Sequence, residues 1–334
     1  MPFRNLAGHG RLLDLTARAA SRGSLPPSLI FAGPDGVGKR RAAVALAQLF
    51  NCTAPQPGGP DRAPDACGAC GPCRRIERGV HADVLMIEPG DTGSIKVDQV
   101  RQAIERSAYR PFEGRRRVVI VDDADAMEAP AQNALLKTLE EPPSASSFVL
   151  VTSRPDMLLP TVRSRCQHLR FGRLAPGDVA AVLIADHGFA EPAAHAAAAL
   201  ADGSIGQALE GDTEGYTGAR DAAEALLQQA ATATNPGQRL AAAKALGADR
   251  VDRDELSRRL RLVLSMLRDL GVLLSRADER TLANGDLVDS LQRLTRSYDG
   301  ERTVRAFSAV DRALMALDRN ASPKIVADWI VLQL

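Results

Sequence analysis

Short apolar runs alternate with helical patterns through the first half of the chain. Five compact apolar runs, each bounded by turn or charged residues, predict buried β-strands. These strands are expected at Leu29–Ala32, Val84–Ile87, Val118–Val121, Phe148–Val151 and His168–Phe171. Between them, apolar positions at helical spacing predict helices that include Arg41–Phe50, Val97–Ala108 and Ala131–Glu141. This alternation predicts an α/β fold, with a parallel sheet covered by helices on both faces.

The second half of the chain carries helical patterns only. Short Ala-rich helices are expected at Asp178–Asp186 and Ala193–Ala201, and the glycines and acids of Gly211–Gly218 predict a linker. Asp252 and Glu255 stand at capping-box spacing and begin an amphipathic helix. Its apolar face comprises Leu256, Leu260, Val263, Leu264 and Leu267. This half is therefore expected to be entirely helical.

Length and charge narrow the range of functions. A chain of 334 residues is long enough for two or three domains with substantial cores. Its 42 Lys and Arg residues nearly balance its 41 Asp and Glu residues, so no strong overall attraction to DNA or to an anionic membrane is expected. The sequence shows no apolar run of membrane-spanning length and no signal-peptide core. We therefore expect a cytoplasmic protein without membrane contact, whose five cysteines do not form disulfides.

The most specific motif follows the first expected strand. It reads Gly33-Pro-Asp-Gly36-Val-Gly38-Lys39-Arg40 and leads into a helix, which is the context of a phosphate-binding loop. The glycines let backbone N–H groups converge on phosphate oxygens, and Lys39 would reach the outer phosphates. A chance Gly-rich turn is the alternative, but here strand, loop, lysine and helix are in register. Arg40 departs from the pattern, because a Ser or Thr hydroxyl at this place helps to hold Mg²⁺.

Two acids end the third expected strand. The apolar run Val118–Val121 is followed by Asp122 and Asp123. In a phosphate-loop ATPase the first acid holds Mg²⁺ and the second, usually Glu, polarises the attacking water. The motif is weak alone, because apolar strands often end in Asp, but beside the phosphate loop it predicts a vestigial or working Walker B element. Asp122 thus joins the glycines and Lys39 in a candidate nucleotide site.

Four cysteines have the spacing of a structural metal site. Cys67, Cys70 and Cys73 stand three residues apart, and Cys52 lies at the end of the preceding helix. Four thiolates can close a tetrahedral Zn²⁺ site without an open position, so the ion would be structural. Free thiols and a redox pair are the alternatives, and the even spacing in an irregular loop favours zinc. Cys166 precedes a strand and is expected to be a small buried residue.

Arg165 has no functional role that the surrounding sequence indicates. Arg165 lies in the triplet Ser164-Arg165-Cys166, shortly before the last expected strand. From the residues alone, a surface arginine or a salt bridge is the expected role.

These motifs together resemble the bacterial clamp-loader members of the AAA+ superfamily, along nearly the whole chain. Very specific to that family are the run Asn133-Ala-Leu-Leu-Lys and the triplet Ser-Arg-Cys. Further matching segments are Gly8-His9, residues 33–39, the four-cysteine insert, residues 133–143, 151–155 and 159–166, and Asn320-x-x-Pro-Lys324 before the last helix.

The resemblance implies three domains. Residues 1–171 would form an AAA+ parallel-sheet nucleotide-fold domain that contains a zinc-binding insert at 52–73. Residues 172–212 would form a small helical lid, and residues 213–334 an all-helical collar that drives assembly.

The resemblance also implies partners and a role. Clamp-loader subunits form a heteropentameric ring with ATP between neighbours, and the arginine matching Arg165 reaches the ATP of the next subunit. The partners would be the motor (gamma/tau) and delta subunits of DNA polymerase III, with the sliding clamp and primer-template DNA engaged through the complex.

Three catalytic elements depart from the motor pattern. Arg40 replaces Ser or Thr, Asp123 replaces Glu, and Gly206 stands where the lid motif has Arg. The combination favours the stationary class of subunit, without ATPase activity of its own, and leaves binding of ATP or ADP open. The alternatives are an active motor ATPase of the same family and a zinc-dependent nucleic-acid-binding protein.

Overall fold

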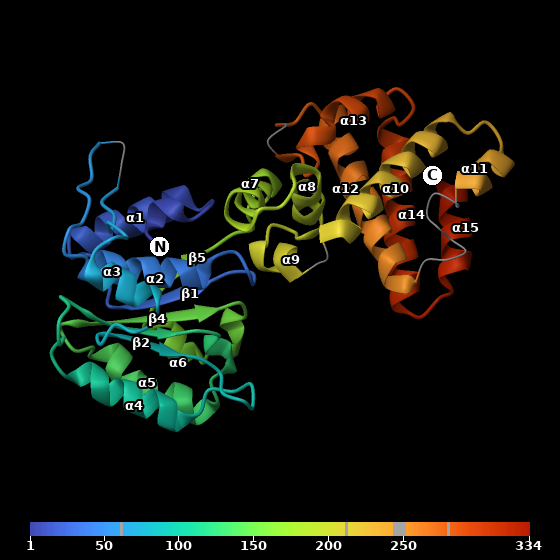
Figure 1. Ribbon diagram of the computed structural model, residues 1–334. Coiled ribbons are helices and arrows are strands. Elements are labelled where there is room, and N and C mark those ends of the chain that lie inside the picture. Colours follow the sequence, from blue (N-terminus) through green and yellow to red (C-terminus); the bar gives the residue numbers. More distant parts are fainter. Residues whose placement is uncertain (61–62, 211–212, 243–251, 279–280) are drawn as a thin grey trace. The chain divides into compact units, whose positions relative to one another are not determined.

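The computed structural model of the chain divides into two compact units (Figure 1). It describes residues 1–60, 63–210, 213–242, 252–278 and 281–334. The first unit comprises Met1–Arg173 and the second Leu174–Leu334. Among the described residues, no helix is both long and apolar enough to cross a membrane.

The first unit is built on a five-stranded sheet in which every pairing is parallel. Its strands are β1 (Ser28–Ala32), β2 (Val84–Ile87), β3 (Arg117–Val121), β4 (Ser146–Thr152) and β5 (Gln167–Arg170). They lie in the order β2-β3-β4-β1-β5, and Leu29 of β1 pairs with Val149 of β4. All five strands predicted from the sequence are confirmed, with shifts of one or two residues at some ends.

Alternate side chains of the strands enter two separate cores, because successive residues of a strand point to opposite faces. Phe31, Ile120 and Val149 pack with α1 (Gly10–Ser21) and α2 (Lys39–Asn51), whereas their neighbours pack with α4 (Val97–Ala108) and α5 (Ala129–Glu140). The central strands are buried along their whole length. The sheet is therefore covered on both faces, as Figure 1 shows for this unit.

Short elements complete the first unit. They are η1 (Phe3–Asn5), α3 (Gly71–Glu77), η2 (Ala124–Ala126), η3 (Pro155–Met157) and α6 (Pro160–Arg163). Helix α3 begins directly after Cys70 and includes Cys73, so part of the cysteine insert is helical.

The second unit is entirely helical in its described residues, as predicted. Its helices are α7 (Pro176–His187), α8 (Glu191–Leu200), α9 (Ile205–Glu210), α10 (Thr213–Thr232), α11 (Pro236–Ala242), α12 (Arg253–Leu274), η5 (Gly285–Leu287), α13 (Val288–Leu294), α14 (Gly300–Asp318) and α15 (Pro323–Gln333). Asp252 caps α12 by accepting a hydrogen bond from the N–H of Glu255 at 2.8 Å, which confirms the predicted helix start. Leu260, Val263 and Leu267 of α12 lie in the large core of this unit.

The linker predicted at Gly211–Gly218 is wrong for its described part. Residues 213–218 form the first turns of α10, and Tyr216 is buried against α7 and α8. Burial of Tyr216 outweighs the low helix propensity of Gly215 and Gly218. Residues 211 and 212 of the predicted linker lie outside the described part of the chain.

Candidate functional site

The predicted phosphate loop connects the end of β1 to the start of α2. Gly36 and Gly38 have φ angles of 71° and 96°, and α2 begins at Lys39. A β-carbon on Gly33 would lie 2.1 Å from the carbonyl oxygen of Phe171, so only glycine fits there. The motif therefore has the backbone form of a loop whose N–H groups and helix N-terminus can face an anion.

Lys39 lies folded back onto this loop. Its Nζ donates hydrogen bonds to the carbonyl oxygens of Gly33 at 2.8 Å and of Pro34 at 2.6 Å, and it lies 3.5 Å from a carboxylate oxygen of Asp35. Burial lowers the pKa of Lys39, while the nearby carboxylate of Asp35 opposes that shift. A phosphate bound in the loop would compete with these carbonyl oxygens for the ammonium group.

Arg40 occupies the place where an active site of this kind holds a metal. Its Nη1 lies 2.9 Å from Oδ2 of Asp122, directly after β3, and 2.5 Å from Oε1 of Glu88, directly after β2. Burial raises the pKa of Asp122, and the Arg40 guanidinium opposes that shift. These residues do not fit Mg²⁺, because a permanent cation is already bound to the carboxylate that would be its ligand.

Two acids near this site differ in their surroundings. Asp123 has a left-handed backbone, with φ of 47°, at the start of η2. Asp125 accepts hydrogen bonds from Thr152 Oγ1 at 2.7 Å and from Arg154 Nε at 2.8 Å. Burial raises the pKa of Asp125, but these hydrogen bonds outweigh it and the net shift is downward. Asp125 thus ties the turn after β3 to the end of β4.

Arg165 forms an ion pair within its own unit. Its Nε and Nη2 lie 3.2 and 3.1 Å from Oε2 of Glu140, at the end of α5, and its Nη1 donates to the carbonyl oxygen of Thr161. Both partners are partly exposed, with 33% of the Arg165 side chain and 60% of the Glu140 side chain accessible. An exposed pair of this kind contributes about 0–1 kcal/mol, so it holds Arg165 only weakly. The adjacent Cys166 is buried, as predicted, and burial raises its pKa to about 12.

The four predicted cysteine ligands lie together. The sulfur atoms of Cys52, Cys67, Cys70 and Cys73 are all within 4.8 Å of one another. Tetrahedral zinc with sulfur at about 2.3 Å requires sulfur separations of about 3.8 Å, and the Cys52 and Cys70 sulfurs are 3.9 Å apart. The N–H groups of Ala69 and Cys70 donate to the Cys67 sulfur at 3.4 and 3.2 Å, which holds that sulfur toward the other three. The cluster therefore fits zinc.

Sequence reasoning missed the acids that hold the two arginines. Glu88 directly follows a predicted strand, and that position indicated the edge of the sheet at which it lies, beside Arg40. Nothing in the sequence indicated that Glu140 would pair with Arg165. The structure brings together Lys39, Arg40 and Asp122, and it keeps the cysteine cluster as a separate site. Gly206 lies in α9 of the second unit.

Comparison with known proteins identifies the family. The sequence model of the family described as "DNA polymerase III, delta subunit" matches residues 8–175, about half of the chain. The chain is 36% identical over 166 residues to the delta' subunit of DNA polymerase III from Bacillus subtilis, an alignment that covers 50% of this chain and 48% of the relative.

Two further relatives are a delta' subunit and a gamma/tau subunit of DNA polymerase III. The delta' subunit of Pseudomonas aeruginosa is 39% identical over 135 residues, which cover 40% of this chain and 39% of the relative. The gamma/tau subunit of Mycobacterium tuberculosis (strain H37Rv) is 33% identical over 181 residues, which cover 54% of this chain and 30% of the relative. The chain thus spans half or less of the length of these curated relatives. It belongs to the DNA polymerase III delta subunit family, as a clamp-loader subunit of the delta-prime type.

Proposed function

We propose that this protein is the stationary, non-hydrolysing subunit of the DNA polymerase III clamp loader in the cytoplasm. It helps to load the sliding clamp onto primer-template DNA, in a heteropentameric ring with the gamma/tau motor and delta subunits. In this proposal residues 172–212 act as the lid and residues 213–334 as the collar that assembles the ring. The family membership and the similarity to delta' subunits support the assignment of this chain to the DNA polymerase III complex.

One observation carries the non-hydrolysing role: the bridge from Arg40 to Asp122 and Glu88. Hydrolysis by a phosphate-loop ATPase needs Mg²⁺ to neutralise charge that develops on the phosphates. Here the guanidinium neutralises the acids instead, on the protein side of the site. The rival reading, an active motor subunit, would need Arg40 to leave both carboxylates whenever Mg²⁺–ATP binds.

The isolated chain is therefore expected to show no Mg²⁺-dependent ATP hydrolysis. Replacement of Arg40 with Thr frees Asp122 and supplies a hydroxyl, so we expect Mg²⁺ to raise the ATP affinity of Arg40→Thr about tenfold or more. Turnover should stay absent in Arg40→Thr, because Asp123 and Gly206 remain unsuited to catalysis. Calorimetry with ATP, with and without Mg²⁺, measures the affinity, and phosphate release measures turnover.

The conservative variant Arg40→Lys provides the matched control, because it keeps a cation beside Asp122. It should resemble the wild type in showing no gain of affinity from Mg²⁺. Hydrolysis by the wild-type chain that depends on Mg²⁺ and disappears in Lys39→Ala would instead establish the motor reading.

The zinc site is the second part of this proposal. Four thiolates fill the tetrahedral coordination of the dication and leave no position for a substrate, so zinc here would stabilise the fold. Elemental analysis of protein purified without chelator should find about one zinc ion per chain. The variant Cys67→Ser should lose most of the zinc, whereas Cys166→Ser, outside the cluster, should retain it. Absence of zinc together with four freely titratable thiols would contradict the assignment.

Arg165 is the third part. We assign it to the ATP bound by a neighbouring subunit, where its guanidinium would stabilise the transferring phosphoryl group. The weak, exposed ion pair with Glu140 supports this role, because a neighbour's phosphates can displace one carboxylate at little cost.

A further inference from the structure

The segment between α4 and β3 is held in one conformation by buried polar groups. We call this segment, Tyr109–Arg116, the aromatic loop, because Tyr109 and Phe112 are 65% and 84% exposed on it. Exposed aromatic side chains do not fix a loop by packing, so contacts of the loop's other groups, most of them backbone N–H groups, hold its conformation.

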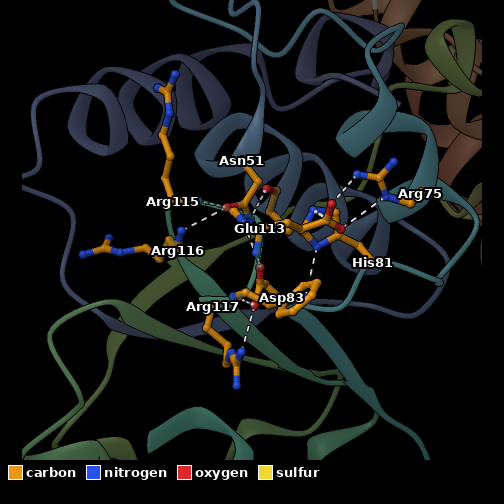
Figure 2. Close-up of polar contacts among 11 residues, drawn as sticks. Asn51, Arg75, His81, Asp83, Glu113, Arg115, Arg116 and Arg117 are labelled. Atoms are coloured by element: carbon orange, nitrogen blue, oxygen red, sulfur yellow. Dashed lines mark hydrogen bonds and ion pairs between the residues drawn. The ribbon is translucent and has the colours of Figure 1, made fainter. Parts of the chain in front are cut away.

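Two acceptors bind the backbone of the aromatic loop (Figure 2). The fully buried carboxylate of Asp83 accepts hydrogen bonds from the N–H groups of Phe112, Glu113 and Gly114 at 2.7–2.9 Å. The side-chain oxygen of Asn51 accepts hydrogen bonds from the next two N–H groups, those of Arg115 and Arg116, at 2.8 and 3.0 Å. Five successive backbone donors are thus bound by two side chains.

Two of the residues that contact the stretch 112–116 are close neighbours, along the chain, of cysteines in the cluster. Asn51 is the residue directly before Cys52 and ends α2. On the other side, Arg75 lies in α3 two residues after Cys73 and forms a two-pronged ion pair with Glu113, at 3.2 and 2.6 Å (Figure 2). In addition, Gln48 of α2 donates to the carbonyl oxygen of Cys73 at 2.8 Å in a buried position.

The cysteine cluster has little apolar support of its own. The buried side chains that pack together there are those of Cys52, Ala66 and Cys73. Helix α3 has 7 residues, too few to be stable alone, and Ile76 anchors one side of it to the core. Besides Ile76, the position of Arg75 therefore depends on what holds Cys70 and Cys73 in place at the start of the same helix.

The geometry points to a specific task for the metal: we propose that zinc at the four cysteines positions the aromatic loop, through Asn51 on one side and through Arg75 and Glu113 on the other. This inference rests on the proposed zinc site. It makes the cysteine cluster the support of an exposed aromatic surface at the end of the sheet where β3 begins, rather than part of the nucleotide site.

Hydrogen exchange of the full-length chain tests the proposal, with mass spectrometry of peptides that cover residues 112–116. Removal of zinc with a chelator should speed exchange of these amides about three- to tenfold, while amides of β4 keep their protection. Arg75→Ala, with zinc content verified, should speed exchange at Glu113 and Gly114 about threefold, since it removes one exposed ion pair. The matched control is Arg74→Ala on the same helix, which should leave these rates unchanged.

Each result has one meaning. Unchanged exchange at 112–116 after zinc removal, or in zinc-loaded Arg75→Ala, overturns the coupling and leaves the zinc site intact. If the purified protein holds no zinc, the zinc assignment fails, and unchanged exchange in Arg75→Ala would then also remove the link between α3 and the loop. If chelation unfolds the whole unit, β4 loses protection as well, and Arg75→Ala alone decides.

Discussion

Replacement of Asp83 with Asn is expected to lower the free energy of unfolding by about 3 kcal/mol. The carboxylate is fully buried, accepts three backbone hydrogen bonds and lies 2.8 Å from Nη2 of Arg117, which is itself mostly buried. An amide keeps the shape but loses the charge, so it leaves the Arg117 guanidinium without a counter-charge. Urea unfolding of the full chain, followed by far-UV circular dichroism, measures the loss.

The pH dependence of stability tests the same group. Burial raises the pKa of Asp83, but the three backbone hydrogen bonds and Arg117 outweigh it and lower the pKa from 3.8 to about 2. A depressed carboxyl pKa contributes stability that is present above the unfolded value and lost as pH falls through the folded value. The wild type should therefore lose about 2 kcal/mol between pH 4 and pH 2 from this group, a loss that Asp83→Asn lacks.

Asp98 offers the matched control. It is 81% exposed and lies near Arg101 on the surface of α4, so Asp98→Asn should change stability by less than about 0.5 kcal/mol. If Asp83→Asn behaves like Asp98→Asn, or keeps the acid loss of the wild type, the buried carboxylate does not hold the aromatic loop in the way described.

The strands and helices could be predicted because their signals are local. A compact apolar run such as Val118–Val121 is recognisable within a few residues, and so is the capping pair of Asp252 and Glu255. The error at Gly211–Gly218 has a tertiary cause, because Tyr216 reaches a core that no local pattern reveals. Glycine content alone could not show that residues 213–218 begin a helix.

The candidate sites were predictable where one motif supplies all parts, and not where distant residues meet. The cysteine spacing indicated which four sulfurs would gather, and the structure confirms that they do. The partners of Arg40 and Asp83 could not be predicted from the sequence, because Glu88 meets Arg40 and Arg117 meets Asp83 only after the sheet has formed. A charged side chain in a sequence indicates that a partner is needed but does not say which residue provides it.

In the proposed function Arg40 and Arg165 act at two different nucleotide sites, Arg40 at the site of this chain and Arg165 at the site of a neighbouring subunit. Arg40 holds two acids at this chain's own phosphate loop, whereas Arg165 is held by one exposed acid and one carbonyl oxygen. A guanidinium that is free to change partners suits a trans-acting role, and one bound between two acids suits a site that no longer takes a metal. This difference in tethering is what favours a stationary subunit over a motor.

Loss of the Arg165 guanidinium is expected to lower the ATPase activity of the assembled clamp loader without affecting the fold of this chain. An arginine finger contributes about 10³-fold or more to turnover at its own site, because it stabilises charge on the transferring phosphoryl group. Arg165→Ala should therefore abolish ATP hydrolysis at one subunit interface and leave hydrolysis at the other interfaces unchanged. The total DNA- and clamp-stimulated ATPase activity should fall partially, and clamp loading should slow. The measurement compares complexes assembled with wild-type or variant chain, after verification that equal amounts of each were incorporated.

Three further variants separate the trans-acting role from a purely structural one. Arg165→Lys keeps the charge but loses the planar set of donors, so it should recover little activity. Arg163→Ala removes a neighbouring arginine that pairs with the exposed Asp156, and it should leave ATPase activity at the wild-type level. Glu140→Gln breaks the same ion pair from the other side: if the pair itself mattered, its effect would match that of Arg165→Ala, whereas the proposed role predicts activity at or above wild type. Equal ATPase and loading rates for Arg165→Ala and wild-type complexes would exclude Arg165 as the residue that acts on a neighbour's ATP.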